Sequence, residues 1–365
     1  MKNKFFFTFL YVFLFALSNV SGNEITFETE KIEILDNGNR VKSYQGIANS
    51  TDHGLTIEAD NFDYNKIDSI LVASQDAVAL INEKNIIINA NKFIYNKNLS
   101  QLSAIGNVEV YDTSNNVSLI SDKMLYHIDL NKIISESPSR IKDELGNLFI
   151  SQNFIYTLND YLIKFDDLEF IDIEKNKTQI IKAYVNTKSK KIIGKDILLD
   201  FNNKTFNKNN EPRLKGNSII SDGNNSIITK GVFTTCKKND NCPPWQLSAK
   251  EIKHNKSKKM IYYKDAWLKI YDKPVFYFPK FFHPDPTVKR QSGFLMPAFK
   301  GSSNLGGAFH IPYYHVISDN KDFTLKPRIY SEEKLLLQSE YRQVNSSSNH
   351  LIDFSLLNGS DIASK

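Results

Sequence analysis

The sequence predicts an all-β protein: a sandwich of short repeated strands, followed by longer strands of the outer-membrane barrel type. Three observations predict this fold class. A strand-like unit recurs at a shift of 31 residues, the alternating segments lengthen from Ser292 onward, and no later stretch reaches the ~18 apolar residues that a membrane-spanning helix needs. If the chain enters a membrane, it does so as β-structure, because only helices and closed barrels satisfy their backbone there.

Length and composition allow two folded domains. The chain has 365 residues, of which 41% are hydrophobic, so it exceeds the usual size of one domain and can form a sizeable core. Lys and Arg outnumber Asp and Glu by 46 to 41. This small excess is explained either by an anionic partner or by a general bias toward Lys and Asn, and the composition leaves both open.

Residues 1–22, MKNKFFFTFLYVFLFALSNVSG, have the layout of a secretory signal peptide. Two lysines precede an apolar run from Phe5 to Leu17, and small residues follow it. The run is too short to span a bilayer comfortably as a mature helix. Cleavage after Ser18 or after Gly22 satisfies the small-residue requirement, and either site predicts an exported protein.

The two cysteines, Cys236 and Cys242, lie close together in TTCKKNDNCPPW. In an exported protein we expect them to form a local disulfide, worth roughly 2 to 2.5 kcal/mol for so short a loop. Zinc is the weaker alternative, because no second pair of cysteines or histidines stands nearby at ligand spacing. No metal site is therefore predicted.

The first half of the chain contains an internal repeat. The segment TIEADNFDYNK, from Thr56, aligns with IINANKFIYNK, from Ile87, and the same shift reaches LISDKMLYHID. Tyrosines mark the register, and columns of large apolar and small residues recur with them. The tyrosines are Tyr64, Tyr95, Tyr126 and Tyr156. The columns comprise Ile57, Ala59, Phe62, Ile88, Ala90, Phe93, Leu119, Ser121, Met124, Phe149, Ser151 and Phe154.

Each repeat reads as two short strands with one apolar face. Alternation changes phase after Ala59, which predicts a bulge or bend near Asp60 and Asn61. Two short strands cannot bury their apolar face alone, so the units are expected to stack into a solenoid-like sandwich whose interior the columns line. The small residues suggest a groove, whereas periodicity alone is equally compatible with a filled core. The two edge strands of such a stack have unpaired backbone groups, so each edge needs a cap or a partner chain.

The segment from Val275 to His315 joins two β architectures. Its prolines and aromatic residues are incompatible with one regular helix, and each proline removes a donor from any strand that contains it. From Ser292 onward, strands such as FTLKPRIY and LIDFSLLN carry one apolar and one polar face. This pattern is typical of an outer-membrane barrel, although a soluble sandwich with one wet face would give it too. These strands are too few to close a barrel, so we expect a longer parent protein.

The same segment carries a family resemblance. The run WQLSAKEI after Thr234, then AWLKIYDKPVFYFPKF, RQSGFLMPAF and IPYYHVI, resemble the outer-membrane lipopolysaccharide-assembly family LptD, also called organic solvent tolerance proteins. The repeats are similar to the OstA-like periplasmic domain that this family shares with the bridge proteins LptA and LptC. The resemblance implies a signal peptide at 1–22, an OstA-like β-jellyroll at 23–285 and the first strands of a transmembrane β-barrel at 286–365.

The resemblance also implies a function. The family receives lipopolysaccharide (LPS) from a periplasmic bridge formed by LptA, holds acyl chains in the jellyroll and passes LPS to the outer leaflet through a lateral gate in a barrel plugged by the lipoprotein LptE. It implies an outer-membrane location with the amino-terminal domain in the periplasm. The gate would include Pro297 and Pro312. The implied acyl path comprises Ile57, Ala59, Phe62, Ile88, Ala90, Phe93, Leu119, Met124, Phe149 and Phe154.

One feature departs from the family, and two other functions compete. The family links distant cysteines by disulfides, whereas Cys236 and Cys242 are neighbours, so maturation controlled by such bridges is not expected. A soluble bridge protein of the LptA or LptC type should lack everything after about Lys280. A β-solenoid enzyme acting on polysaccharide would need clustered carboxylates, but Asp60 and Asp122 resemble turn residues and the histidines lack HExxH spacing. We therefore predict no enzyme activity, no cofactor and no nucleic-acid partner.

Overall fold

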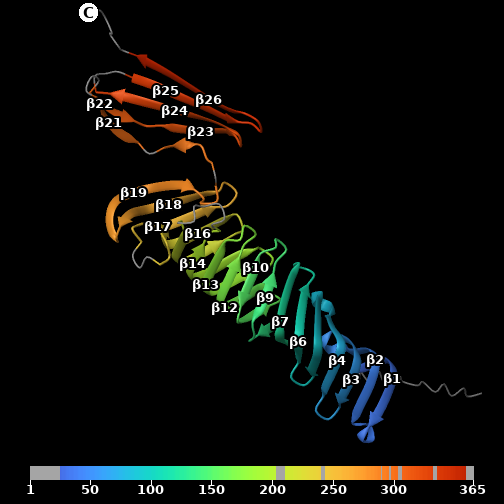
Figure 1. The fold of residues 1–365 in the computed structure, drawn as a ribbon. Helices are drawn as coiled ribbons and strands as arrows, with labels where there is room; N and C mark the ends of the chain where they lie inside the picture. Colours follow the sequence, from blue (N-terminus) through green and yellow to red (C-terminus); the bar gives the residue numbers. More distant parts are fainter. Residues whose placement is uncertain are drawn as a thin grey trace, which may run out of the picture. The chain divides into compact units, whose positions relative to one another are not determined.

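The computed structural model describes residues 25–202, 210–239, 243–288, 290–295, 297–302, 306–331 and 335–358 (Figure 1). Antiparallel sheets dominate, which confirms the predicted all-β class. The chain divides into two compact units, unit 1 up to Asp166 and unit 2 from Asp167. The predicted signal peptide lies outside the described residues. In the described part, no helix is both long and apolar enough to cross a membrane.

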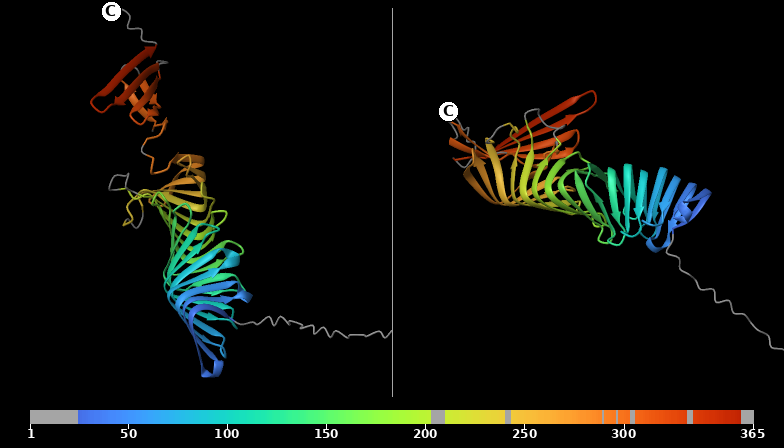
Figure 2. Two further views of the ribbon diagram at one scale, coloured as in Figure 1. Left: turned by 90° about the vertical axis from the view of Figure 1, so that its right-hand side faces the viewer. Right: turned by 90° about the horizontal axis from the view of Figure 1, so that it is seen from below.

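Unit 1 is a meander in which each long strand pairs with the next. Figure 2 shows these strands side by side in chain order, from blue to green. The strands are β1 (Thr26–Leu35), β2 (Arg40–Ser50), β3 (Leu55–Asn65), β4 (Ile70–Ile81), β5 (Ile86–Asn96), β6 (Gln101–Asp112), β7 (Val117–His127), β8 (Lys132–Ser135), β9 (Ser139–Lys142), β10 (Leu148–Ser151) and β11 (Asn153–Thr157), and β12 (Leu162–Ile171) crosses into unit 2. Three short 3-10 turns are η1 (Asp36–Gly38), η2 (Thr51–His53) and η3 (Asn82–Lys84).

A bend in the middle of each long strand turns its second half over. The register between β3 and β4 shifts between Glu58 and Asn61, which confirms the bulge predicted there. Positive φ values accompany the bends of neighbouring strands, for example 66° at Gln75 and 48° at Asn107. Because the face changes at the bend, both halves of a strand present their apolar side chains to the same interior.

The turns of unit 1 form two rims. Rim A consists of the turns 51–54, 82–85 and 113–116; rim B consists of 36–39, 66–69, 97–100 and 128–131. Backbone bonds link neighbouring turns within a rim: Asn82 N donates to Gly54 O on rim A, and Lys97 N donates to Ser69 O on rim B. The sheet is therefore bent along the line of kinks, and the two rims are its free margins.

Unit 2 continues with strands of the same kind and then a second sheet. The first group is β13 (Lys177–Asn186), β14 (Lys191–Asp200), β15 (Arg213–Ser221), β16 (Asn225–Thr234), β17 (Trp245–Asn255), β18 (Met260–Ile270) and β19 (Lys273–Pro284). The second sheet, sheet B, contains β20 (Gly293–Phe294), β21 (Ala298–Ser302), β22 (Gly306–His310), β23 (Tyr313–Ser318), β24 (Lys321–Tyr330), β25 (Leu335–Val344) and β26 (Asn349–Asn358).

Sheet B differs from the sandwich in what it leaves exposed. All of β26 is exposed, including Leu351 at 63% and Phe354 at 56%. The predicted lengthening of the strands from Ser292 onward is wrong: β24, β25 and β26 have 10 residues each, whereas β4 and β6 have 12, because each repeat forms two long strands that continue through a bend. Sheet B begins at Gly293, after β19 ends at Pro284, so the gap between the sheets contains the predicted 285/286 domain boundary. That boundary remains a prediction, since the division into compact units falls at 166/167.

Candidate functional site

The structure gathers all ten side chains of the predicted acyl path in the interior of unit 1. Ile57, Phe93 and Leu119 are completely buried, and the most exposed member, Ala90, shows only 8% of its surface. Small members such as Ala59 and Ala90 stand next to the kinks. The two halves of a strand meet at the kink, so the interior is narrowest there. The interior is closely packed as it stands, so entry of an acyl chain requires the two halves to separate.

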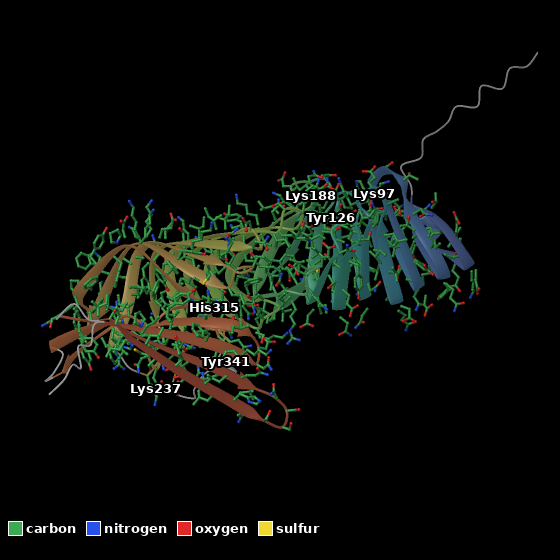
Figure 3. The ribbon with its side chains drawn as sticks, turned by 90° about the horizontal axis from the view of Figure 1, so that it is seen from above. Lys97, Tyr126, Lys188, Lys237, His315 and Tyr341 are labelled. Carbon is green, nitrogen blue, oxygen red and sulfur yellow. The ribbon has the colours of Figure 1, made fainter. Side chains whose placement is uncertain are left out.

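Side chains from the two rims meet across the mouth of unit 1. Tyr95, at the rim B end of β5, places its Oη 2.8 Å from Ser50 Oγ and 2.6 Å from His53 Nδ1 on rim A. Beside them, Lys97 Nζ lies 3.1 Å from Asp52 Oδ2. Lys97 is labelled in Figure 3. We call these five residues the rim clasp.

A second set of contacts closes the mouth further along unit 1. Tyr156 Oη donates to Asp112 Oδ2 at 2.5 Å, and Lys84 Nζ donates to Asn159 Oδ1 at 2.9 Å. Asp112 is 3% exposed, so its bond to tyrosine satisfies a buried carboxylate. The mouth is thus held by bonds between residues 44 and 75 positions apart in the chain.

Burial affects the acidity of two register tyrosines, Tyr95 and Tyr126. Burial raises the pKa of Tyr95 to about 12, and burial also raises the pKa of Tyr126 to about 12. Their rings lie in the core while their hydroxyls reach polar groups at the rims, as Tyr126 does with Asn131 at 3.3 Å. In the sequence analysis these tyrosines only marked the repeat. Their position near the strand ends is the signal that could have predicted a contact with a rim.

In unit 2, an apolar pocket of about 400 Å³ opens among β16 to β19. Phe233, Trp245 and Leu247 form one side, and Phe278 and Phe281 of β19 form another. The pocket is lined almost entirely by carbon, as expected of a site for an aliphatic chain. Sequence reasoning noted the aromatic density of this segment but did not place these residues in a common site.

A histidine completes the pocket without adding charge. His283 packs on Phe233 with ring centroids 4.9 Å apart, and its Nε2 lies 2.7 Å from Tyr263 Oη. Burial lowers the pKa of His283 below its usual value. The imidazole is therefore neutral near pH 7, which keeps the pocket apolar.

A buried contact between a histidine and a carboxylate fixes the chain where it leaves β19. His254 and Asp285 are 3% and 2% exposed, and His254 Nε2 contacts Asp285 Oδ2. Burial on its own raises the pKa of Asp285, but bonds from His254 and from Thr287 N and Oγ1, both at 2.7 Å, outweigh it and lower the pKa. The segment leading to sheet B thus begins from an anchored position.

Pro297 and Pro312 both fall at breaks between strands of sheet B. Pro297 separates β20 from β21, and Pro312 separates β22 from β23. Leu295 N donates to Pro312 O at 2.8 Å. Opposed residues in a hydrogen-bonded antiparallel pair exchange two bonds, and proline has no N–H for the second. The Leu295–Pro312 pair is therefore held by half its normal bonds.

Pro327 in β24 repeats this defect one strand further. Ile311 N donates to Pro327 O at 3.4 Å, and Pro327 cannot return the bond to Ile311. The register His310↔Arg328 and Tyr313↔Leu325 places these two residues opposite each other. Sequence reasoning treated Pro327 as one apolar position in an alternating strand; only the pairing register aligns it with the break at Pro312.

One of the two cysteines, Cys236, lies within the described residues. Cys236 is half-buried, with Sγ 3.6 Å from Trp245 O, whereas Cys242 lies outside the described residues. The local disulfide remains a prediction. Across the part of the chain that the structure describes, no group of three or more His, Cys, Asp and Glu side chains is arranged to hold a metal ion.

Comparison with known proteins identifies relatives of part of the chain. Residues 261–345 match the family model described as LptD protein. The LPS-assembly protein LptD of Pseudomonas aeruginosa (strain UCBPP-PA14) is 33% identical over 135 residues, 37% of this chain and 14% of the relative. The LptD protein of Ralstonia nicotianae is 38% identical over 131 residues, 36% of this chain and 16% of the relative. The family resemblance is thereby confirmed, with matches that span about a seventh of these relatives' length.

A solved structure is also similar to a part of the chain. It is LptH, the LptA homologue of the periplasmic lipopolysaccharide transport device of Pseudomonas aeruginosa. The match has a TM-score of 0.26 and 14% identity and covers 28% of this chain and 76% of that one.

Proposed function

We propose that this chain, which is related to the LptD family of LPS-assembly proteins over residues 261–345, binds LPS and transfers it to the outer leaflet of the outer membrane. One observation carries the proposal. The family-matched segment contains both β19, a wall of the apolar pocket, and the half-bonded pairs of sheet B. The same stretch of sequence thus contains a wall of the pocket proposed to hold an aliphatic chain and the weakened strand pairs of sheet B.

The proposed path begins in unit 1. LPS arrives from a periplasmic bridge protein of the LptA type, and its acyl chains enter between the rims once the rim clasp opens. Burial of acyl chains against residues such as Ile88 and Phe93 supplies binding energy at about 25 cal/mol per Å² of apolar surface. The apolar pocket bounded by Phe281 then receives the chains. The action is binding and release, without covalent chemistry.

The proposed exit is a seam in sheet B. Membrane strands must satisfy their backbone by pairing, so strands that miss bonds at Pro312 and Pro327, beside the break at Pro297, separate more easily than their neighbours. We place sheet B in the outer membrane as part of a larger barrel with an LptE-type plug, and the bent sandwich in the periplasm. The competing function, a soluble bridge of the LptA or LptC type, does not account for the family match in residues 261–345.

Photo-crosslinking in cells tests the path. A photoreactive residue at Ile88, or at Phe281 in the pocket, should capture LPS in the full-length protein. Glu58 is exposed on the outer face of β3, so the same residue placed there is the matched control. Equal capture from Ile88 and Glu58 would contradict the proposed interior path. Capture at neither Ile88 nor Phe281, in protein that is normally assembled, would contradict the proposed function as a whole.

A further inference from the structure

The outer surface of β13 to β19 carries a lysine at the bend of every strand. All seven side chains are exposed. These strands lie side by side (Figure 1), so at the usual strand spacing the lysines form a band about 30 Å long. We call them the lysine band: Lys182, Lys195, Lys215, Lys230, Lys250, Lys264 and Lys280.

The band is cationic beyond what the composition explains. At the corresponding bends of unit 1, exposed Lys92 and Lys123 are matched by exposed Asp76 and Asp122. The carboxylates near the lysine band are fewer than its lysines: Asp167, Glu169, Asp196, Glu251 and Asp265. Within the described residues, no carboxylate lies within 4.0 Å of any of the seven ammonium groups.

Two pairs of directly opposed lysines make the band unfavourable for the isolated fold. Lys182 stands directly opposite Lys195, and Lys264 stands directly opposite Lys280 on one side and Glu251 on the other. Like charges in directly opposed positions of a sheet repel each other and destabilise the pairing. An external anionic surface would relieve this repulsion.

Exposed aromatic residues flank the lysine pair on β18 and β19. Trp267 and Tyr277 are opposed on one side, 42% and 41% exposed, with ring centroids 5.1 Å apart. On the other side, Phe282 is 64% exposed and opposes Tyr262 with centroids 6.1 Å apart. Aromatic rings beside lysines are typical of surfaces that sit at lipid head groups, where the rings enter the interface and the ammonium groups meet phosphates.

We propose that this face, the lysine band with its aromatic pairs at β18 and β19, docks on an anionic phospholipid surface. Its nearness to a membrane follows from chain length. Eight residues separate Pro284 from Gly293, so at most about 30 Å of extended chain joins β19 to sheet B. The inference takes one assumption from the proposed function, namely that sheet B lies in the membrane.

The test uses full-length protein reconstituted in phosphatidylethanolamine vesicles with and without phosphatidylglycerol, each containing a phospholipid with a photoactivatable head group. Mass spectrometry then locates the crosslinks. We expect crosslinks in β18 and β19 that depend on phosphatidylglycerol and decline with added salt. Each lysine near an anionic surface is worth ~1 kcal/mol, so Lys264→Gln with Lys280→Gln should lower capture by about 25-fold.

The matched control is Lys92→Gln with Lys123→Gln, which removes the same charge from exposed bends of unit 1 and should leave capture unchanged. Equal capture without phosphatidylglycerol, or equal loss in the control, would overturn the proposal. Competition by inorganic phosphate at constant ionic strength would identify a discrete anion site and overturn it too. The salt series on unmodified protein serves as a second measurement that needs no variant to fold. Loss of LPS crosslinking with phospholipid capture intact would count against the proposed function alone.

Discussion

At the scale of single residues, Tyr95 makes two of the contacts that close the mouth of unit 1. Its hydroxyl serves both Ser50 and His53, so Tyr95→Phe leaves two polar side chains without that partner while the ring still fills the core. Loss of such a buried bond costs about 1 to 3 kcal/mol. We expect amide hydrogen exchange at 51–54 and 97–100 to accelerate about tenfold or more, because local opening becomes easier.

The matched control for Tyr95 is Tyr111→Phe. Tyr111 is 39% exposed and its hydroxyl donates to Glu109 on the surface, so loss of this bond should change exchange little. Unchanged exchange at both rims in Tyr95→Phe would show that the clasp does not hold the mouth.

His283 makes a pH-dependent contribution at the same scale. Its pKa is lowered in the folded protein, so its favourable neutral state is fully available above the ordinary pKa of about 6.5. Stability is lost as pH falls below that value toward the folded pKa, since the unfolded chain binds the proton more readily. We expect the melting temperature of the full-length protein to decline between pH 7 and 5, and His283→Gln to flatten that decline. His350→Gln, at an exposed position of β26, should leave the pH profile unchanged.

At the scale of elements, the strand pairs of sheet B are weakened in register. Leu295–Pro312 and Ile311–Pro327 each hold one bond where two are usual. We therefore expect two separations: β20 from β23 at the Leu295–Pro312 pair, and the segment between β22 and β23 from β24 at the Ile311–Pro327 pair. Pro312→Ala with Pro327→Ala restores two N–H donors, each worth about 0.5 to 1.5 kcal/mol, and should slow exchange at 293–318 while reducing LPS export.

Pro279→Ala is the control for these prolines, because Pro279 is exposed in the bend of β19 and outside sheet B. Normal export and surface LPS in the Pro312/Pro327 double variant, at normal protein levels, would refute a role for the half-bonded pairs. Slower exchange without any change in export would limit their role to stability.

At the scale of the whole molecule, the proposed transport through unit 1 requires the rims to separate. Cysteines in place of Asp52 and Lys97, joined by a short thiol-reversible crosslinker, should abolish LPS capture at Ile88, and a reductant should restore it. Cysteines in place of Asp68 and Asn98 test the reagent itself, because both lie on rim B and joining them leaves the mouth free. Undiminished capture in the Asp52–Lys97 crosslinked protein would mean that lipid does not enter between the rims.

The sequence by itself determined the all-β class, the alignment of the repeats with one another, the bulge near Asp60 and the burial of every predicted path residue. Each of these follows from side chains a few positions apart, since alternation and turn chemistry are local. Only the tertiary structure decided that the sheet folds over, that Tyr95 and Tyr156 clasp the opposite rim, that Pro327 aligns with Pro312 and that lysines line one outer face. Contacts such as Tyr95 with Ser50, 45 residues apart, depend on bends and twist accumulated over several strands. No short stretch of sequence encodes that accumulated geometry.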